Sequence, residues 1–266
     1  MTVEQHYQQQ LQPAALLAAV RTILGETFSS DQLAPIDQLH LGGRRATRQM
    51  LTQCQLGPTL QVLDVGCGLG GTSRLIAETA GCRVTGIDLT ADFCHLARQL
   101  SVQLDSELPV CFVQGDAQRL PFADHSFDLI VSQHCLMNLP RAALALGEFR
   151  RVLRPGGALL LHEVLAGSGG EPLYPVPWAS DASQSFVVPE AQLRAGLTDA
   201  GFTLAHWCDE TDAALQWRTR HSQREQHGLP TLSPKLIYGE RFALLAANLL
   251  TSLQQRRVRI VQALAR

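Results

Sequence analysis

The sequence predicts an α/β fold in which a mostly parallel β-sheet is covered by helices on both faces. Two observations predict it. Strand-like and helix-like segments alternate from Gln61 onward, and the strand-like segments are almost wholly apolar. Strands buried on both faces have this composition, because a parallel sheet covered by helices has no face toward water. The chain of 266 residues is 45% hydrophobic and 17% charged, which suits one large core and excludes a disordered or fibrous chain.

Residues 1–55 are predicted to form a helical cap before the sheet. Leu17, Val20 and Leu24 recur at helical spacing, and Gly25 ends that helix. A second helix is predicted over residues 44–54. The polar segment DQLHLGGRR lies between the two helices, and helical periodicity does not explain it.

Seven segments then have the composition of strands. Helical patterns that end near Gly81, Leu104, Leu153 and Gly201 separate most of them. Residues 211–254 are predicted to form two helices, with residues 218–225 as a solvated helix face. The strand-like segments are QVLDV, RVTGID, VCFVQ, FDLIVS, ALLLHEV, FTLAHW and the closing RVRIVQALA.

Composition and charge exclude several partners. Lys+Arg is 22 and Asp+Glu is 24, so the net charge is −2, and no basic stripe favours nucleic acid or an anionic membrane. No apolar run approaches the roughly 20 residues of a membrane helix, and the N-terminus lacks the order of a signal peptide. The seven cysteines show no C-x-x-C pair or zinc spacing. We therefore predict a cytoplasmic protein with no metal site and a small-molecule partner, which could form a homodimer.

A glycine-rich loop follows the first strand. GCGLGG matches G-x-G-x-x-G at Gly66, Gly68 and Gly71, a turn that lets backbone N–H groups approach a ligand. Such a loop also fits a ligand-free turn or a dinucleotide site. Asp64 precedes the loop by two residues, and its carboxylate favours a ligand with an ammonium or sulfonium over a pyrophosphate.

Two further acids stand at the ends of the next two strands. Asp88 ends the second strand, where a carboxylate can hold a ribose diol. Asp116 follows the third strand, where it can accept a hydrogen bond from an exocyclic amine such as that of adenine. Each acid alone could be a helix cap or a solvated loop residue. Together the three acids favour a nucleoside with a cationic tail.

These motifs resemble those of the class I S-adenosylmethionine-dependent methyltransferases. The resemblance rests on VLDVGCGLGG, GIDLT, GDAQRLPFADHSFDLIVSQ and RVLRPGG, and covers about residues 56–165. It implies a Rossmann-like seven-stranded sheet with an antiparallel last strand, a helical insertion before that strand, and S-adenosylmethionine as cofactor, with S-adenosylhomocysteine as product. It also implies the cofactor-binding residues Asp64, Gly66, Cys67, Gly68, Gly70, Gly71, Asp88, Leu89, Asp116, Ala117 and Gln133.

A narrower resemblance points to an acceptor. DQLHLGGRRATRQML, SQHCLMNL and YPVPWASDASQSF look like a bacterial branch near the glycine, sarcosine and dimethylglycine N-methyltransferases, which includes enzymes of natural-product pathways. The chain would then be a single methyltransferase domain, 1–266. It would comprise a cap (1–55), a cofactor-binding core (56–165) and a substrate-side part (166–266), and the expected acceptor atom is a nitrogen.

His134 is the predicted catalytic base, because it follows the fourth strand and histidine titrates near pH 6.5. Asn138 is predicted to orient the acceptor. His40, His134, Tyr174 and Trp178 are predicted to bind substrate, the two aromatics through cation–π contacts with a methylated ammonium. For each residue a structural role is the alternative.

Three alternatives to N-methylation stay open. O- or C-methylation of a biosynthetic intermediate would make more use of a base at His134. A nicotinamide-dependent oxidoreductase conflicts with Asp64 before the glycine loop. A non-catalytic cofactor-binding partner would bind the same cofactor without turnover.

Overall fold

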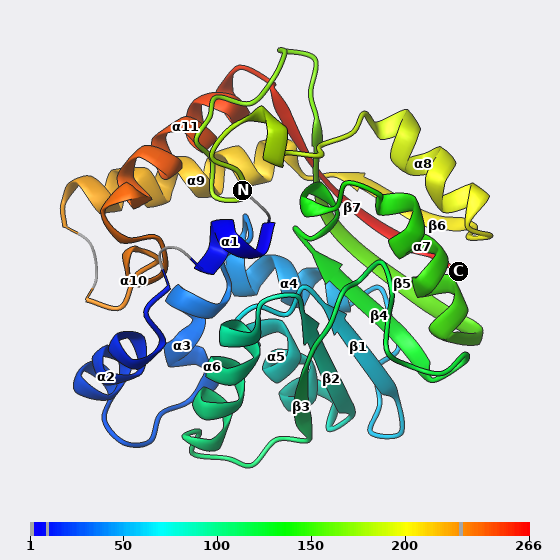
Figure 1. Ribbon diagram of the computed structural model, residues 1–266, viewed down its shortest axis with the longest axis horizontal. Helices are drawn as coiled ribbons and strands as arrows, with labels where there is room; N and C mark the ends of the chain where they lie inside the picture. Colours follow the sequence, from blue (N-terminus) through cyan, green and yellow to red (C-terminus); the bar gives the residue numbers. More distant parts are fainter. Residues whose placement is uncertain (1–2, 9–10, 229–230) are drawn as a thin grey trace.

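The computed structural model describes residues 3–8, 11–228 and 231–266 as a single seven-stranded sheet with helices on both faces (Figure 1). The strand order is β3-β2-β1-β4-β5-β7-β6. β1 to β5 run parallel, and β7 runs antiparallel to both β5 and β6. This confirms the predicted fold. The strands are β1 (Gln61–Val65), β2 (Arg83–Asp88), β3 (Val110–Gln114), β4 (Phe127–Gln133), β5 (Leu153–Ala166), β6 (Leu204–Asp209) and β7 (Val258–Ala265).

Successive strand residues contribute to two different cores, as a two-residue period requires. Val62 of β1 and Val131 of β4 pack with α4 (Gly43–Leu51) and α5 (Gly71–Ala80) on one face. Their neighbours Leu63 and Ile130 pack with α7 (Ala142–Val152) and α8 (Glu190–Asp199) on the other face. Both faces of the central strands are therefore dry, which explains their apolar sequences.

The strand order reverses between β1 and β4, since β2 lies on one side of β1 and β4 on the other. In open α/β sheets this switch point leaves a crevice at the carboxyl ends of the strands, where ligands bind. Asp64 of β1 pairs in register with Gly86 of β2 and Val131 of β4. The ends of these three strands, with the loops that follow, therefore open at one edge.

Helices from both ends of the chain cover that edge (Figure 1). The cap contains α1 (Val3–Gln8), α2 (Pro13–Leu24) and α3 (Ser30–Asp37), and α6 (Ala91–Val102) follows β2. Residues 211–254 form α9 (Thr211–Gln226), α10 (Lys235–Tyr238) and α11 (Phe242–Gln254) rather than the predicted two helices. Gly239, with φ of 59°, ends α10 and separates it from α11.

The prediction of a solvated face at residues 218–225 was wrong for Arg218. The residue is 5% exposed, and its guanidinium donates to Glu225 about two turns further along α9. α9 packs against α11, and this packing turns Arg218 toward the protein.

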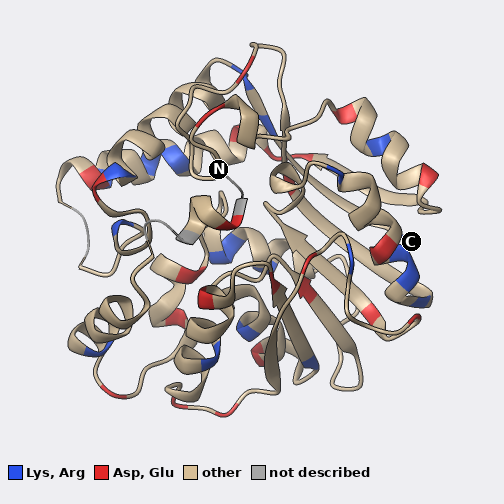
Figure 2. Cartoon of the chain, in the orientation of Figure 1, with Lys and Arg blue, Asp and Glu red and all other residues tan. Residues whose placement is uncertain are grey.

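Basic and acidic residues are interspersed along the helices, strands and loops of the chain, in line with the small net charge (Figure 2). Within residues 3–8, 11–228 and 231–266, no helix combines the length and the hydropathy needed to cross a bilayer.

Candidate active site

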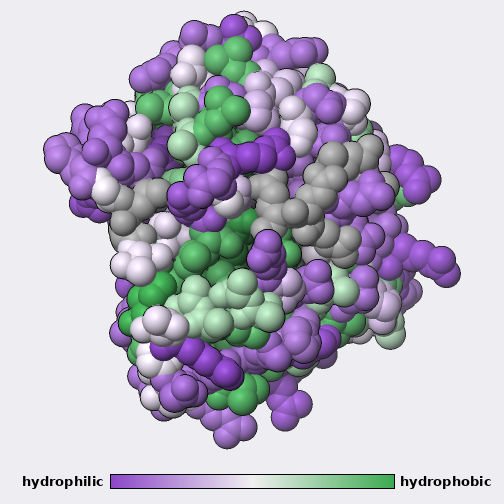
Figure 3. Space-filling view, turned by 60° about the vertical axis from the view of Figure 1, so that its left-hand side comes forward, coloured by the Kyte–Doolittle hydropathy of each residue, from purple (hydrophilic) through white to green (hydrophobic). Residues whose placement is uncertain are grey.

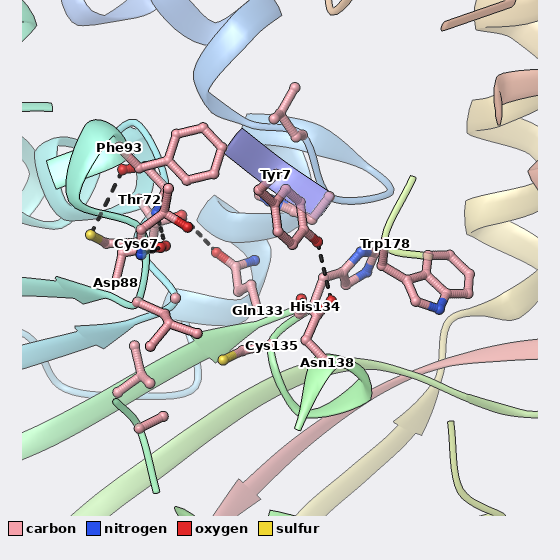
Figure 4. Close-up of a pocket in the computed structure, with 18 of the residues that line it drawn as sticks. Tyr7, Cys67, Thr72, Asp88, Phe93, Gln133, His134, Cys135, Asn138 and Trp178 are labelled. Carbon is pink, nitrogen blue, oxygen red and sulfur yellow. Dashed lines mark hydrogen bonds between the residues drawn. The ribbon is translucent and has the colours of Figure 1, made fainter. Parts of the chain in front are cut away.

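A cavity lies at the carboxyl ends of β1, β2 and β4, where the switch point predicts one (Figure 4). Its lining comes from the glycine loop, the segments after β2, β3 and β4, the cap and residues 177–178. Most of the predicted site residues are brought together here: His40, Asp64, Gly66, Cys67, Gly68, Asp88, Leu89, Asp116, Ala117, Gln133, His134, Asn138 and Trp178.

The glycines of the loop have two different tasks. Gly66 and Gly68 line the cavity, and a Cβ at Gly68 would meet no protein atom within 4 Å. Gly70 and Gly71 lie outside the lining. A Cβ there would come within 2.5 Å of the Phe112 ring and 2.4 Å of the Asp37 carbonyl oxygen respectively. The second half of the motif therefore allows close packing, and the first half leaves backbone open to the cavity.

Asp88, at the end of β2, is hydrogen-bonded to the glycine loop. Its two carboxylate oxygens accept hydrogen bonds from the backbone N–H groups of Gly68 and Thr90, each at 2.9 Å. Burial raises the pKa of Asp88, while the two N–H groups act in the opposite direction. Each oxygen keeps a second lone pair, so a diol could donate to the same carboxylate.

Asp64 lies deeper, 2% exposed, and accepts a hydrogen bond from the Ser73 hydroxyl at 2.6 Å. Burial raises the pKa of Asp64 to about 7. A cationic ligand beside the carboxyl would favour its ionised form and would itself be stabilised.

Beyond Asp88 the cavity becomes an apolar slot. Asp116 borders it after β3 and accepts a hydrogen bond from the Gln118 backbone N–H at 2.8 Å. A planar base would be enclosed here by apolar side chains and could donate to the remaining oxygen of Asp116. The apolar residues are Ile87, Leu89, Phe93, Ala117 and Leu139.

His134 occupies a left-handed backbone conformation, φ 51°, directly after β4. Its N–H donates to the His162 carbonyl of β5 at 2.8 Å. The next two N–H groups, of Cys135 and Leu136, donate at 3.2 Å to the carboxyl group of Glu163, which also lies on β5. β5 thereby fixes the turn that carries His134.

His134 belongs to a cluster of three imidazoles. Its ring stacks on that of His162 at 5.1 Å between centroids, and the His40 ring lies 6.0 Å and 5.7 Å from the other two. Burial lowers the pKa of all three, to about 4 for His40 and about 3 for His162. Nε2 of His134 is buried without a hydrogen-bond partner among the described residues. The cluster is therefore neutral at pH 7, and His134 can accept a proton.

Within the described ranges, no group of His, Cys, Asp and Glu has the arrangement of a metal site.

Sequence reasoning missed Tyr7, which the cap contributes to the cavity (Figure 4). Its hydroxyl donates to Oδ1 of Asn138 at 3.2 Å, and Nδ2 of Asn138 donates to the His134 carbonyl at 3.2 Å. Asn138 therefore ties α1 to the turn of His134. Only the tertiary fold brings Tyr7 here, since 131 residues separate it from Asn138.

His40 and Gln133 belong to one buried hydrogen-bond network. Thr72 donates to Oε1 of Gln133 at 2.7 Å, and Thr47 lies 3.3 Å from the same oxygen and 3.0 Å from Nε2 of His40. Nε2 of His40 also lies 3.2 Å from the Gly43 carbonyl oxygen. Through His40, the polar segment DQLHLGGRR thus joins a hydrogen-bond network that connects α4 with the residue after the glycine loop, Thr72.

The two aromatics of the insertion differ. Trp178 lines the cavity and is 3% exposed, with its indole N–H donating to Ser185 at 2.9 Å. Tyr174 does not line the cavity and packs on the surrounding apolar cluster. The structure therefore places Trp178, but not Tyr174, in the lining of the cavity.

Glu163 allows a test of its role through pH. Burial raises its pKa to about 8, against 4.5 for the free side chain. Between these values the folded chain binds a proton that the unfolded chain has lost. The contribution of Glu163 to the free energy of unfolding is therefore largest below about pH 4.5. It decreases as the pH rises toward 8, by at most about 1.4 kcal/mol per pH unit. We expect Glu163→Gln to flatten this slope in urea unfolding.

Glu148→Gln is the control with the opposite sign. Arg151 lowers the pKa of Glu148, so that carboxylate contributes stability that is lost as pH falls. If Glu163→Gln leaves the slope between pH 5 and 8 unchanged, Glu163 does not hold a proton in the folded protein.

Known methyltransferases are similar to this chain over part of its sequence. Residues 63–161 match the family described as Methyltransferase domain. Over 130 residues the chain is 34% identical to Methyltransferase GfsG of Streptomyces halstedii, covering 49% of this chain and 47% of that protein. The chain spans about half the length of the first curated relatives that it matches.

Two solved structures share the fold along the whole chain. The [4+2]-cyclase SpnF has a TM-score of 0.69 and 24% identity, covering 100% of this chain and 97% of that one. Phosphoethanolamine N-methyltransferase 2 of Haemonchus contortus, in complex with S-adenosylmethionine, has a TM-score of 0.76 and 18% identity, covering 100% and 60%.

The strand order and the antiparallel β7 are those of the class I methyltransferase fold. Residues 63–161, which carry the glycine loop and the strand ends around the cavity, match the methyltransferase family model.

Proposed function

We propose that the protein transfers a methyl group from S-adenosylmethionine to a nitrogen atom of a small-molecule acceptor. The observation that carries the proposal is that one cavity is lined by Asp64, Asp88 and Asp116 together with His134. The acids suit a nucleoside with a cationic tail, and the space above Gly68 leaves room for it. We assign the cofactor-binding role to the residues named above that line this cavity, with Gly70 and Gly71 supporting the loop.

The cofactor, when bound, supplies a methyl group on a sulfonium, which is a good leaving group. The chain must then position an acceptor, exclude water and take up a proton. His134 is placed for the proton, because its ring lines the cavity and its Nε2 has no partner among the described residues. Tyr7 and Trp178 close the cavity from the cap and from the insertion.

Acceptance at nitrogen is favoured by the neutral imidazole cluster. A protonated amine must lose its proton before its lone pair can attack. Neutral imidazoles do not repel the positive charge of such an ammonium group, whereas protonated imidazoles would. The resemblance to the glycine and sarcosine N-methyltransferase branch supports the same assignment. An O- or C-acceptor would need the same histidine, so product analysis with labelled methyl groups distinguishes these acceptors.

Calorimetry with the product S-adenosylhomocysteine tests the proposal. We expect it to bind, and to bind more tightly than NAD, because Asp64 and Asp116 disfavour a pyrophosphate at the loop. Tighter binding of NAD would contradict the assignment of the cofactor.

Asp88→Ala should weaken S-adenosylhomocysteine binding by about 1–3 kcal/mol, roughly 5- to 150-fold, since two ligand hydroxyls would lose their acceptor. Asp92→Ala, at a partly exposed position in the first turn of α6 outside the cavity lining, is the matched control and should leave binding unchanged. Equal dissociation constants for wild type and Asp88→Ala would show that Asp88 does not hold the ribose.

A further inference from the structure

A second cavity adjoins the first. Its volume is about 510 Å³, and it lies between the α3–α4 region on one side and α9, α10 and α11 on the other. The two cavities are therefore neighbouring chambers with a common wall. The residues that line both are Leu39, Leu41, Pro177, Tyr238 and Leu249.

The wall of this second chamber is mostly apolar. Trp217 provides a flat surface, with its ring stacked on His221 at 3.9 Å between centroids and an interplanar angle of 29°. Hydrophobic side chains also gather across the middle of the molecular face in Figure 3, bordered by hydrophilic ones. A hydrocarbon body of considerable length would be dehydrated in this chamber. The other apolar residues are Ala34, Pro35, Leu39, Leu41, Leu232, Pro234, Phe242, Ala246 and Leu249.

Arginines outnumber acids in the same wall. The acids are Asp31 and Glu225, and both are paired: Asp31 with Arg44 and Arg48, and Glu225 with Arg218. The guanidinium groups of Arg45 and Arg224 have no hydrogen bond or ion pair within the described part of the chain.

Arg218 is the residue that indicates a ligand. Its side chain is 5% exposed and lines the chamber, yet its Nε has no hydrogen-bond partner among the described residues. A buried donor that lacks a partner is costly, and the guanidinium fork matches an anionic oxygen pair. A carboxylate in the chamber would supply the missing acceptor.

We propose that this second chamber binds the body of the methyl acceptor, an elongated apolar molecule that carries a carboxylate. The carboxylate is bound by Arg218, with Arg45 and Arg224 at the rim. The apolar body lies against Trp217, and the end that receives the methyl group passes Tyr238 toward His134. That this ligand is the methyl acceptor rests on the proposed function, whereas its apolar and anionic character is inferred from the second chamber alone.

Calorimetry with dodecanoate as the probe, on protein saturated with S-adenosylhomocysteine, tests the proposal. Dodecanoate should bind at least tenfold more tightly than 1-dodecanol or dodecyltrimethylammonium, which share its chain and lack its charge. Equal affinities for the three probes would overturn the recognition of an anion.

Four variants locate the site. Arg218→Gln, and separately the double variant Arg45→Gln/Arg224→Gln, should each weaken dodecanoate binding at least tenfold. The double variant changes only exposed side chains, so it keeps the test valid if Arg218→Gln does not fold.

Ala34→Trp should abolish binding by filling the chamber. Arg83→Gln, an exposed arginine at the start of β2, is the control and should bind as wild type does. Unchanged binding in Ala34→Trp would overturn the location.

The two proposals fail separately. Binding of S-adenosylhomocysteine without binding of dodecanoate refutes the second chamber and leaves the methyltransferase proposal standing. Binding of dodecanoate with the expected variant pattern, but without binding of S-adenosylhomocysteine, supports an anionic apolar ligand and refutes the proposed function.

Discussion

Replacing His134 should lower turnover by roughly 10²-fold or more, the usual contribution of a positioned base. His134→Asn is the variant of choice, because asparagine tolerates the left-handed backbone of this position, φ 51°. Burial lowers the pKa of the His134 imidazole well below 6.5, so the wild-type base stays neutral at neutral and mildly acidic pH. The wild-type rate should fall only as pH drops below the ordinary histidine range. The rate at which S-adenosylmethionine is converted to S-adenosylhomocysteine in the presence of an accepted substrate measures this turnover.

His125→Asn is the matched control for that experiment. His125 also has a positive φ, 57°, but lies before β4, at the opposite edge of the sheet. The same substitution in the same backbone conformation should there leave turnover intact. S-adenosylhomocysteine affinity should be unchanged in both variants. Full turnover of His134→Asn at saturating substrate would make His134 a structural residue.

Asp37→Ala should lower the free energy of unfolding by about 3–5 kcal/mol, because it leaves a buried guanidinium without its counter-ion. Arg74 is fully buried and donates to Asp37 at 2.7 Å and to the Leu69 carbonyl at 2.6 Å. Burial raises the pKa of Asp37 even though Arg74 stabilises its ionised form. Urea unfolding at pH 7 measures the loss.

Asp31→Ala, in the same helix, separates this effect from the loss of any carboxylate. Asp31 is 64% exposed and pairs with Arg44 and Arg48, so its removal should cost under about 1 kcal/mol. The double variant Asp37→Leu/Arg74→Met should recover much of the stability, since neither charge then remains. Similar losses for Asp37→Ala and Asp31→Ala would refute the role of the buried pair.

The fold could be predicted because its signals are local. The first three apolar runs end at a glycine or an acid, and the alternation of strands and helices leaves few topologies. The acids Asp64, Asp88 and Asp116 could be placed together because the carboxyl ends of parallel strands meet at one edge. The predicted split of residues 211–254 into two helices missed α10, whose four residues carry no periodicity.

The rest of the site depends on contacts between distant segments. Tyr7 reaches Asn138 only because the cap folds over the sheet, and nothing near Tyr7 in the sequence indicates this. Glu163 did carry a signal, a charged residue inside the apolar strand ALLLHEV, but its partners are the N–H groups of another loop. Arg218 looked like one more charge on a polar helix, and its burial follows from how α9 packs.

The position of β7 in the sheet has a consequence for how the chain assembles. β7 lies between β5 and β6 and pairs with both, from Leu159 opposite Ala265 to Asp209 opposite Val261. β6 therefore has no partner strand until residues 258–265 are present, although it precedes them by about fifty residues. The parallel half of the sheet, β1 to β5, can order first, whereas α8, β6 and the helices after it complete their packing only when β7 inserts. While those residues are still inside the ribosome, the nascent chain would expose the edge of β5 that later pairs with β7.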